Sequence, residues 1–155
     1  MGKLSWWLQV LYTLNERLRD LRDDNNLKQI EMAKILGITQ ANYSRWETGK
    51  ELIPLEKLNI LCNYFHITMD YIIGISKNKE CLKEYNFNNK TIGNNLKTFR
   101  KNNNITQVEL ANFLNTTHST ISAYERGKTT LLTAFALQIV YKYNISLDWL
   151  IGRLN

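Results

Sequence analysis

Two short segments of the chain carry small, hydrogen-bonding side chains at helical spacing. At about 100° per residue, polar and small residues fall in one arc of each segment. The two outward sets are Gln40, Ala41, Ser44 and Arg45 in the first segment, and His118, Ser119, Ser122 and Ala123 in the second. Amide, hydroxyl and guanidinium groups form directional hydrogen bonds, so these arcs suit the recognition of a polar partner. The opposite arcs contain Tyr43, Trp46 and Glu47, and Ile121, Tyr124 and Glu125. One face of each helix is therefore predicted to pack, and the other to face outward.

The two segments belong to an internal repeat. Residues 29–50 read QIEMAKILGITQANYSRWETGK and residues 107–128 read QVELANFLNTTHSTISAYERGK, aligned without a gap at an offset of 78 positions. Nine of the 22 aligned pairs are identical, including both terminal pairs. Both halves of the chain are therefore predicted to fold into the same supersecondary unit.

Each outward face needs a second helix behind it. Ile30, Ala33 and Leu36 recur at three-residue intervals and predict one face of a short helix before the polar one. Gly37, or Asn115 in the second copy, is a residue type that accepts a left-handed backbone, which predicts a tight turn. A threonine two residues later suits the N-cap of the next helix. The predicted unit is helix, tight turn, helix.

A polar helix face supported by a second helix resembles the helix-turn-helix of the lambda-repressor and Cro-like (Xre) family. The resemblance rests on the glutamine-led opening, the threonine cap, the aromatic-Glu-x-Gly-Lys ending and a downstream Asp-x-Leu-Ile-Gly-like segment, each present twice. It covers residues 14–74 and 92–152. It implies an all-α protein with two tandem five-helix DNA-binding domains, whose partner is double-stranded DNA.

The resemblance assigns roles to named residues. The two outward sets would read base edges, and Arg45 has the clearest chemistry for this because a guanidinium can hold guanine in a bidentate way. The predicted phosphate contacts are Gln29, Lys50, Gln107, Arg126 and Lys128. The glutamines open the first helix of each motif, where free backbone N–H groups favour an anion, although a solvated surface glutamine is the alternative.

The resemblance also implies two structural ion pairs, Arg22 with Glu47 and Arg100 with Glu125. Thr106 and Glu109 form a capping box in the second copy, where the first copy has Lys28 as its cap residue. Further helices are expected from Pro54 to Tyr64 and from Leu132 to Tyr143. Two last short helices would be capped by Thr68 and Ser146.

The predicted domains are residues 1–74 and 91–155, joined by a linker over residues 75–90 with one helical turn near Cys81. At 155 residues and a formal net charge of +6, the composition suits a polyanionic partner. Residues 91–155 carry seven Lys or Arg against three acidic residues, whereas residues 14–74 carry eight against nine. The second domain is the stronger candidate for electrostatic attachment.

No catalytic constellation, phosphate loop or metal-ligand spacing is found in the sequence, so we expect no enzyme, no cofactor and no metal, and no small-molecule domain is evident. Cys62 and Cys81 are unsuited to metal binding with the two histidines, and nothing resembles a signal peptide. A reduced, cytoplasmic protein is expected. Cys62, among apolar neighbours, is predicted to be a core residue.

The N-terminal run from Leu4 to Tyr12 is apolar but too short to span a bilayer. Its helical spacing predicts a first helix that starts early and continues to about Asp24. Trp6 and Trp7 either cover an exposed part of their own domain, which we favour, or form a self-association surface that would give a homodimer.

The function predicted from these observations is sequence-specific transcriptional regulation, as a repressor. The alternative is a protein-interaction module, such as an antitoxin or an anti-repressor partner, in which one or both copies no longer bind DNA. The near-neutral first domain keeps this alternative open.

Overall fold

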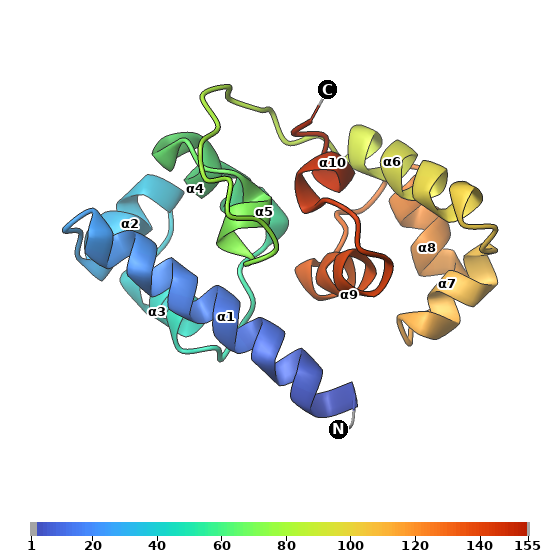
Figure 1. Cartoon of the computed structure of the whole chain (residues 1–155), viewed down its shortest axis with the longest axis horizontal. Coiled ribbons are helices and arrows are strands. Elements are labelled where there is room, and N and C mark those ends of the chain that lie inside the picture. Colours follow the sequence, from blue (N-terminus) through green and yellow to red (C-terminus); the bar gives the residue numbers. More distant parts are fainter. Residues whose placement is uncertain (1–2, 155) are drawn as a thin grey trace. The chain divides into compact units, whose positions relative to one another are not determined.

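The computed structural model describes residues 3–154, and these residues form ten α-helices and no β-strand. The chain divides into two compact units, Met1–Glu84 and Tyr85–Asn155, each with five helices (Figure 1). The predicted all-α fold with two tandem five-helix domains is confirmed.

The helices of the two units follow one another in the same order. The first unit contains α1 (Lys3–Asp24), α2 (Gln29–Leu36), α3 (Gln40–Glu47), α4 (Leu55–Phe65) and α5 (Met69–Ile72). The second contains α6 (Asn89–Asn102), α7 (Gln107–Phe113), α8 (His118–Glu125), α9 (Thr133–Tyr143) and α10 (Leu147–Ile151). The pairs α2 and α3, and α7 and α8, pack together as the predicted helix-turn-helix units.

The backbone repeats as closely as the sequence does. Each residue in the described part of the chain with a left-handed φ has a counterpart 78 positions away. The pairs are Asn26 with Asn104, Gly37 with Asn115, Gly49 with Gly127, His66 with Asn144, and Gly74 with Gly152. At the turn between the two motif helices, φ is 67° at Gly37 and 56° at Asn115. Both residue types accept this conformation, so the tight turn predicted there is confirmed.

The buried face of α2 differs from the prediction. Met32, Ala33 and Leu36 are buried, whereas Ile30 is 42% exposed. The same holds in α7, where Leu110 and Ala111 are buried and Val108 is 53% exposed. The three-residue spacing wrongly placed Ile30 on the buried face, because the buried face of a helix contains residues that are three and four apart.

The predicted caps are present at the helix starts. The hydroxyls of Thr39 and Thr117 accept from the backbone of the third residue of α3 and α8, and Thr68 and Ser146 do the same for α5 and α10. Thr106 and Glu109 form the full capping box. At Lys28 only half of the box exists, since the Lys28 N–H donates to Glu31 but no side chain caps the helix.

Part of the segment predicted as a linker is bonded to the first unit. Residues up to Glu84 cluster with the first unit, and α6 starts at Asn89. The Cys81 N–H donates to the His66 carbonyl over 2.8 Å, and the Thr68 N–H donates to the Lys79 carbonyl over 3.0 Å. These bonds tie the segment back to the start of α5. The helical turn expected near Cys81 does not form, because that backbone pairs with residues 66–68 instead.

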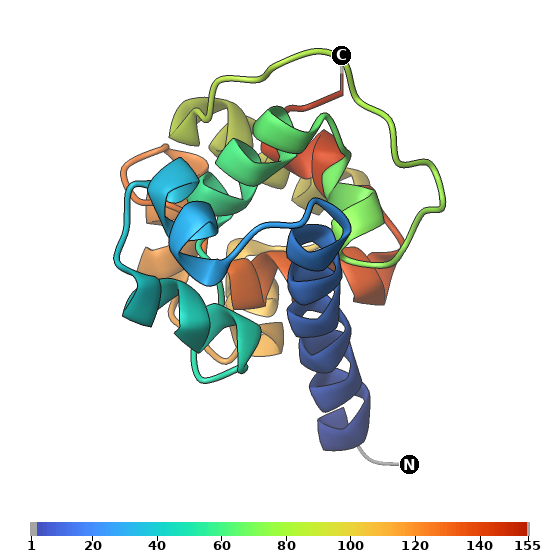
Figure 2. The ribbon, with the colours of Figure 1, turned by 90° about the vertical axis from the view of Figure 1, so that its left-hand side faces the viewer.

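Helix α1 starts at Lys3 and ends at Asp24, as predicted, and is 22 residues long against 14 in its counterpart α6. Its N-terminal part extends beyond the other helices of its own unit (Figure 2). Leu8 and Tyr12 are 58% and 63% exposed. The side chains of Trp6 and Trp7, for which we predicted covering or self-association, lie outside the described residues. None of the helices in residues 3–154 has both the length and the apolar character of a membrane span.

Candidate nucleic-acid interface

The second helix of each motif presents the predicted polar face. In α3, Gln40, Ala41 and Arg45 are exposed and Ser44 is half-buried. In α8, His118 and Ser119 are exposed, and Ser122 and Ala123 are half-buried. The opposite faces are buried, through Tyr43, Trp46 and Glu47 in α3 and Ile121, Tyr124 and Glu125 in α8. The structure therefore offers both sets outward, and their contact with bases stays a prediction.

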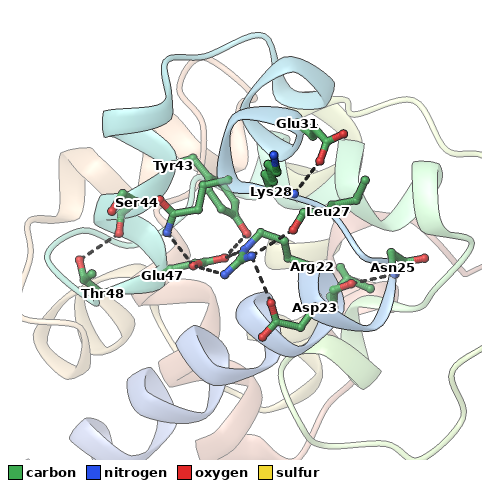
Figure 3. Close-up of polar contacts among 12 residues, drawn as sticks. Arg22, Asp23, Asn25, Leu27, Lys28, Glu31, Tyr43, Ser44, Glu47 and Thr48 are labelled. Carbon is green, nitrogen blue, oxygen red and sulfur yellow. Dashed lines mark hydrogen bonds and ion pairs between the residues drawn. The ribbon is translucent and has the colours of Figure 1, made fainter.

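A buried carboxylate at the end of each outward helix fixes that helix to α1 or α6. Arg22 Nε donates to Glu47 Oε1 over 2.6 Å, and Nη2 donates to Oε2 over 3.3 Å (Figure 3). Arg100 holds Glu125 with the same two bonds, at 2.5 and 3.3 Å. Each arginine also donates from Nη1 to a backbone carbonyl, of Leu27 or Ile105, over 3.0 Å. The two ion pairs implied by the resemblance are both formed.

Gln29 and Gln107 have a role that sequence reasoning missed. Gln29 Nε2 donates to Glu47 Oε2 over 2.9 Å, and Gln107 Nε2 donates to Glu125 Oε2 over 2.6 Å. The amides were expected to face a phosphate, but one N–H of each is directed at the buried carboxylate. Each glutamine thus connects the start of the first motif helix to the end of the second, and its remaining N–H stays a predicted phosphate contact.

The first unit adds a third donor to its carboxylate. Tyr43 Oη donates to Glu47 Oε1 over 2.7 Å, whereas the equivalent residue of the second unit is Ile121, which has no donor. Burial alone would raise the pKa of Glu47, but the hydrogen bonds from Arg22, Gln29 and Tyr43 outweigh burial, so the pKa lies below its ordinary value. Burial and the bond to Glu47 raise the pKa of Tyr43. The carboxylate stays charged and the phenol stays neutral near pH 7.

The cations expected to contact phosphates lie beside the ends of the outward helices. Lys50 and Lys128 are exposed, each directly after a left-handed glycine. Arg126 is exposed, and its Nε donates to the Ser122 carbonyl over 3.2 Å. Asn42, exposed on α3 between Ala41 and the buried Tyr43, was not among the predicted contacts. Its amide can both donate and accept, so Asn42 joins the candidate face.

The family model for the helix-turn-helix fold, HTH_3, matches the chain twice, at residues 18–72 and 96–150. The chain belongs to this helix-turn-helix family. The two matches contain α2 with α3 and α7 with α8, so both copies of the repeat carry the family motif. The Xre-type resemblance deduced from the sequence is confirmed.

Several curated proteins are similar to parts of the chain. The antitoxin PezA of Streptococcus pneumoniae is 29% identical over 72 residues, which is 46% of this chain and 46% of PezA. The uncharacterized HTH-type transcriptional regulator YobD of Bacillus subtilis is 34% identical over 61 residues, which is 39% of this chain and 54% of YobD. The transcriptional activator BcrR of Enterococcus faecalis is 34% identical over 60 residues, which is 39% of this chain and 29% of BcrR. The chain spans about half the length, or less, of these relatives, and no solved structure matches it significantly.

Within residues 3–154, no three His, Cys, Asp or Glu side chains gather as metal ligands. Cys62 is fully buried in the core of the first unit, as predicted, and Cys81 is half-buried.

Proposed function

We propose that the chain is a sequence-specific, double-stranded DNA-binding transcriptional regulator that acts as a repressor. The observation that carries the proposal is the pair of outward faces on α3 and α8, each fixed from behind by an arginine and a glutamine that bond to a buried glutamate. A helix held rigidly in this way can enter the major groove and present donors and acceptors to base edges. The relatives named as a transcriptional regulator and a transcriptional activator support the regulatory part of this function.

The two units differ in net charge and are therefore expected to contribute differently to DNA binding. The second unit has the excess of cations, including the exposed Arg126 and Lys128 next to α8, and would supply most of the phosphate attraction. The first unit has almost no net charge and would add base contacts through α3. The protein is further proposed to be a cytoplasmic, non-enzymatic binding protein.

The salt dependence of binding tests the proposal. Affinity of the full chain for duplex DNA should fall steeply between about 50 and 200 mM salt, because bound cations displace counterions from the phosphates. A duplex selected from a random pool should bind more tightly than an unselected one at every salt concentration. Equal binding of all duplexes would exclude sequence-specific regulation.

A second function is favoured by one observation, the similarity to the antitoxin PezA. In this alternative, one unit binds a protein partner and no longer binds DNA. The near-neutral first unit, with its exposed Leu8 and Tyr12, suits an apolar protein interface better than the second unit does. Binding to such a partner would change little with salt, which distinguishes it from duplex binding.

A further inference from the structure

Arg45 is held on the outward face by one acidic residue. Its Nε and Nη2 both lie 2.8 Å from Oε1 of Glu51. The two side chains are 49% and 51% exposed, so the pair lies at the surface and not in the core. Among the described residues, none bonds to Nη1 of Arg45. One edge of the guanidinium is therefore occupied, and the other faces solvent.

The backbone brings Glu51 back to Arg45. After α3 the chain turns at Gly49, where φ is 77°, and the Glu51 N–H then donates to the Arg45 carbonyl over 3.2 Å. In the second unit the corresponding turn closes one residue earlier, since the Lys128 N–H donates to the Ala123 carbonyl over 3.0 Å. The wider turn in the first unit places the Glu51 side chain beside the guanidinium.

The internal repeat supplies a comparison. At the equivalent positions of the second unit, 78 residues later, Arg45 is replaced by Ala123 and Glu51 by Thr129. The two charged residues are therefore present together in one unit and absent together in the other. An exposed pair of this kind adds little to folding stability. Its joint presence is better explained by what Arg45 does on the outward face.

We propose that Glu51 is a positioning residue that orients Arg45 for the recognition of one guanine. A guanidinium is planar, and its five N–H groups form two donor edges. Glu51 takes the edge made by Nε and Nη2. The remaining edge, made by Nη1 and the second N–H of Nη2, matches the O6 and N7 acceptors of guanine in the major groove. This inference rests on the proposed function of the chain.

The carboxylate has two opposite effects on binding. Its negative charge repels phosphates, so Glu51 lowers affinity for every duplex. By holding the guanidinium, it also prevents Arg45 from turning to a nearby phosphate, which would give affinity without sequence information. Removal of Glu51 should therefore raise the affinity for every duplex and also lower the discrimination at one base pair. If Glu51 acted only by repelling phosphates, its removal would raise the affinity and leave the discrimination unchanged.

The test compares the full chain with E51T, which introduces the residue of the second unit, and with R45A and the double variant. Each is measured against the duplex selected by the parent protein and against duplexes changed at single base pairs. E51T should lower the preference for guanine at one position about tenfold. In the R45A background E51T should change that preference no further. E56T, which removes an exposed acid elsewhere in the first unit, should leave the preference unchanged.

Three outcomes would overturn the inference. If R45A loses the guanine preference and E51T keeps it, Glu51 does not position Arg45, and the proposed function stands. If E51T changes base preference equally with and without Arg45, Glu51 contacts a base by itself. If the parent protein prefers no base at any position, the proposed function fails together with the inference. Melting temperatures of the variants, expected within a few degrees of the parent because both residues are exposed, verify folding.

Discussion

Replacement of Glu47 by alanine should unfold the first unit far below its normal melting temperature, although Glu47 faces away from the proposed DNA surface. Its side chain is 1% exposed, and it accepts hydrogen bonds from Arg22, Gln29 and Tyr43. The truncation leaves the Arg22 guanidinium, itself only 16% exposed, with the exposed Asp23, 3.1 Å away, as its remaining carboxylate partner. Loss of one member of a buried pair costs about 3–5 kcal/mol.

This cost is large for a unit of this size. A domain of 60–100 residues loses about 4–8 °C of melting temperature per kcal/mol, so Glu47→Ala should lower the melting temperature of the first unit by at least about 12 °C. Hydrogen exchange of the full chain, read separately for residues 3–84 and 85–154, assigns the loss to one unit. Glu125→Ala should have the same effect on the second unit, reduced by about 1 kcal/mol because Ile121 provides no third donor.

Two further variants determine whether the pair itself is responsible. Glu56 is exposed, and Glu56→Ala should change stability by less than about 0.5 kcal/mol. The double variant Arg22→Met with Glu47→Leu should recover most of the loss, since a buried ion pair can be replaced by apolar side chains. A melting temperature of Glu47→Ala within about 2 °C of the parent would show that the Arg22–Glu47 pair contributes little to the stability of the first unit.

Other predictions follow from the same structure. Folding lowers the pKa of Glu47, so its charged form stabilises the first unit fully above its unfolded pKa of about 4.3, and this stabilisation is lost as the pH falls through the folded pKa. Urea unfolding between pH 7 and 3 measures the loss. Glu47→Gln should remove this part of the pH dependence. Gly93→Ala should destabilise the second unit, where alanine in a helix normally stabilises, because its Cβ would contact the Tyr124 carbonyl and lie 2.7 Å from the Glu125 carbonyl oxygen; a raised melting temperature would contradict the close packing of α6 on α8. Lys128→Ala should weaken binding to all duplexes equally and reduce the salt slope by about one unit, whereas Arg45→Ala should relax preference at particular base pairs; the reverse result in a titration series would contradict the assigned geometry.

The sequence predicted the architecture well because the architecture depends on local chemistry that occurs twice. A threonine cap or a left-handed turn residue depends only on its close neighbours in the sequence. Both copies of the repeat carry these signals, so each copy supported the interpretation of the other. Arg22 and Glu47 were paired only through the family resemblance, since 25 residues separate them and no local pattern connects them.

The features that sequence reasoning missed depend on tertiary contacts. Gln29 looked like a surface residue at a helix start, but the fold brings the buried carboxylate of Glu47 within hydrogen-bond distance. Residues 75–84 had no helical or strand periodicity, and they pack because Cys81 and Lys79 bond to residues 66–68. Arg153, two residues from the C-terminus, is 1% exposed and pairs with the buried Asp148 at 3.2 Å. A terminal arginine is ordinarily solvated, so nothing in the sequence indicated that pair.

Selection of bound sequences from a pool of random duplexes, with the full chain, measures directly whether α3 and α8 read DNA. The outward residues of the two helices differ at three of four positions, because only Ser44 and Ser122 match. Two such faces cannot favour the same bases, so we predict an enriched, non-palindromic site with two unlike half-sites and one chain bound per duplex. The triple variant Q40H, A41S and R45A, which gives α3 the residues of α8, should shift the enriched site toward symmetry. No enrichment over the starting pool would show that neither helix reads DNA sequence, and two chains bound on a perfect palindrome would exclude reading by a single chain.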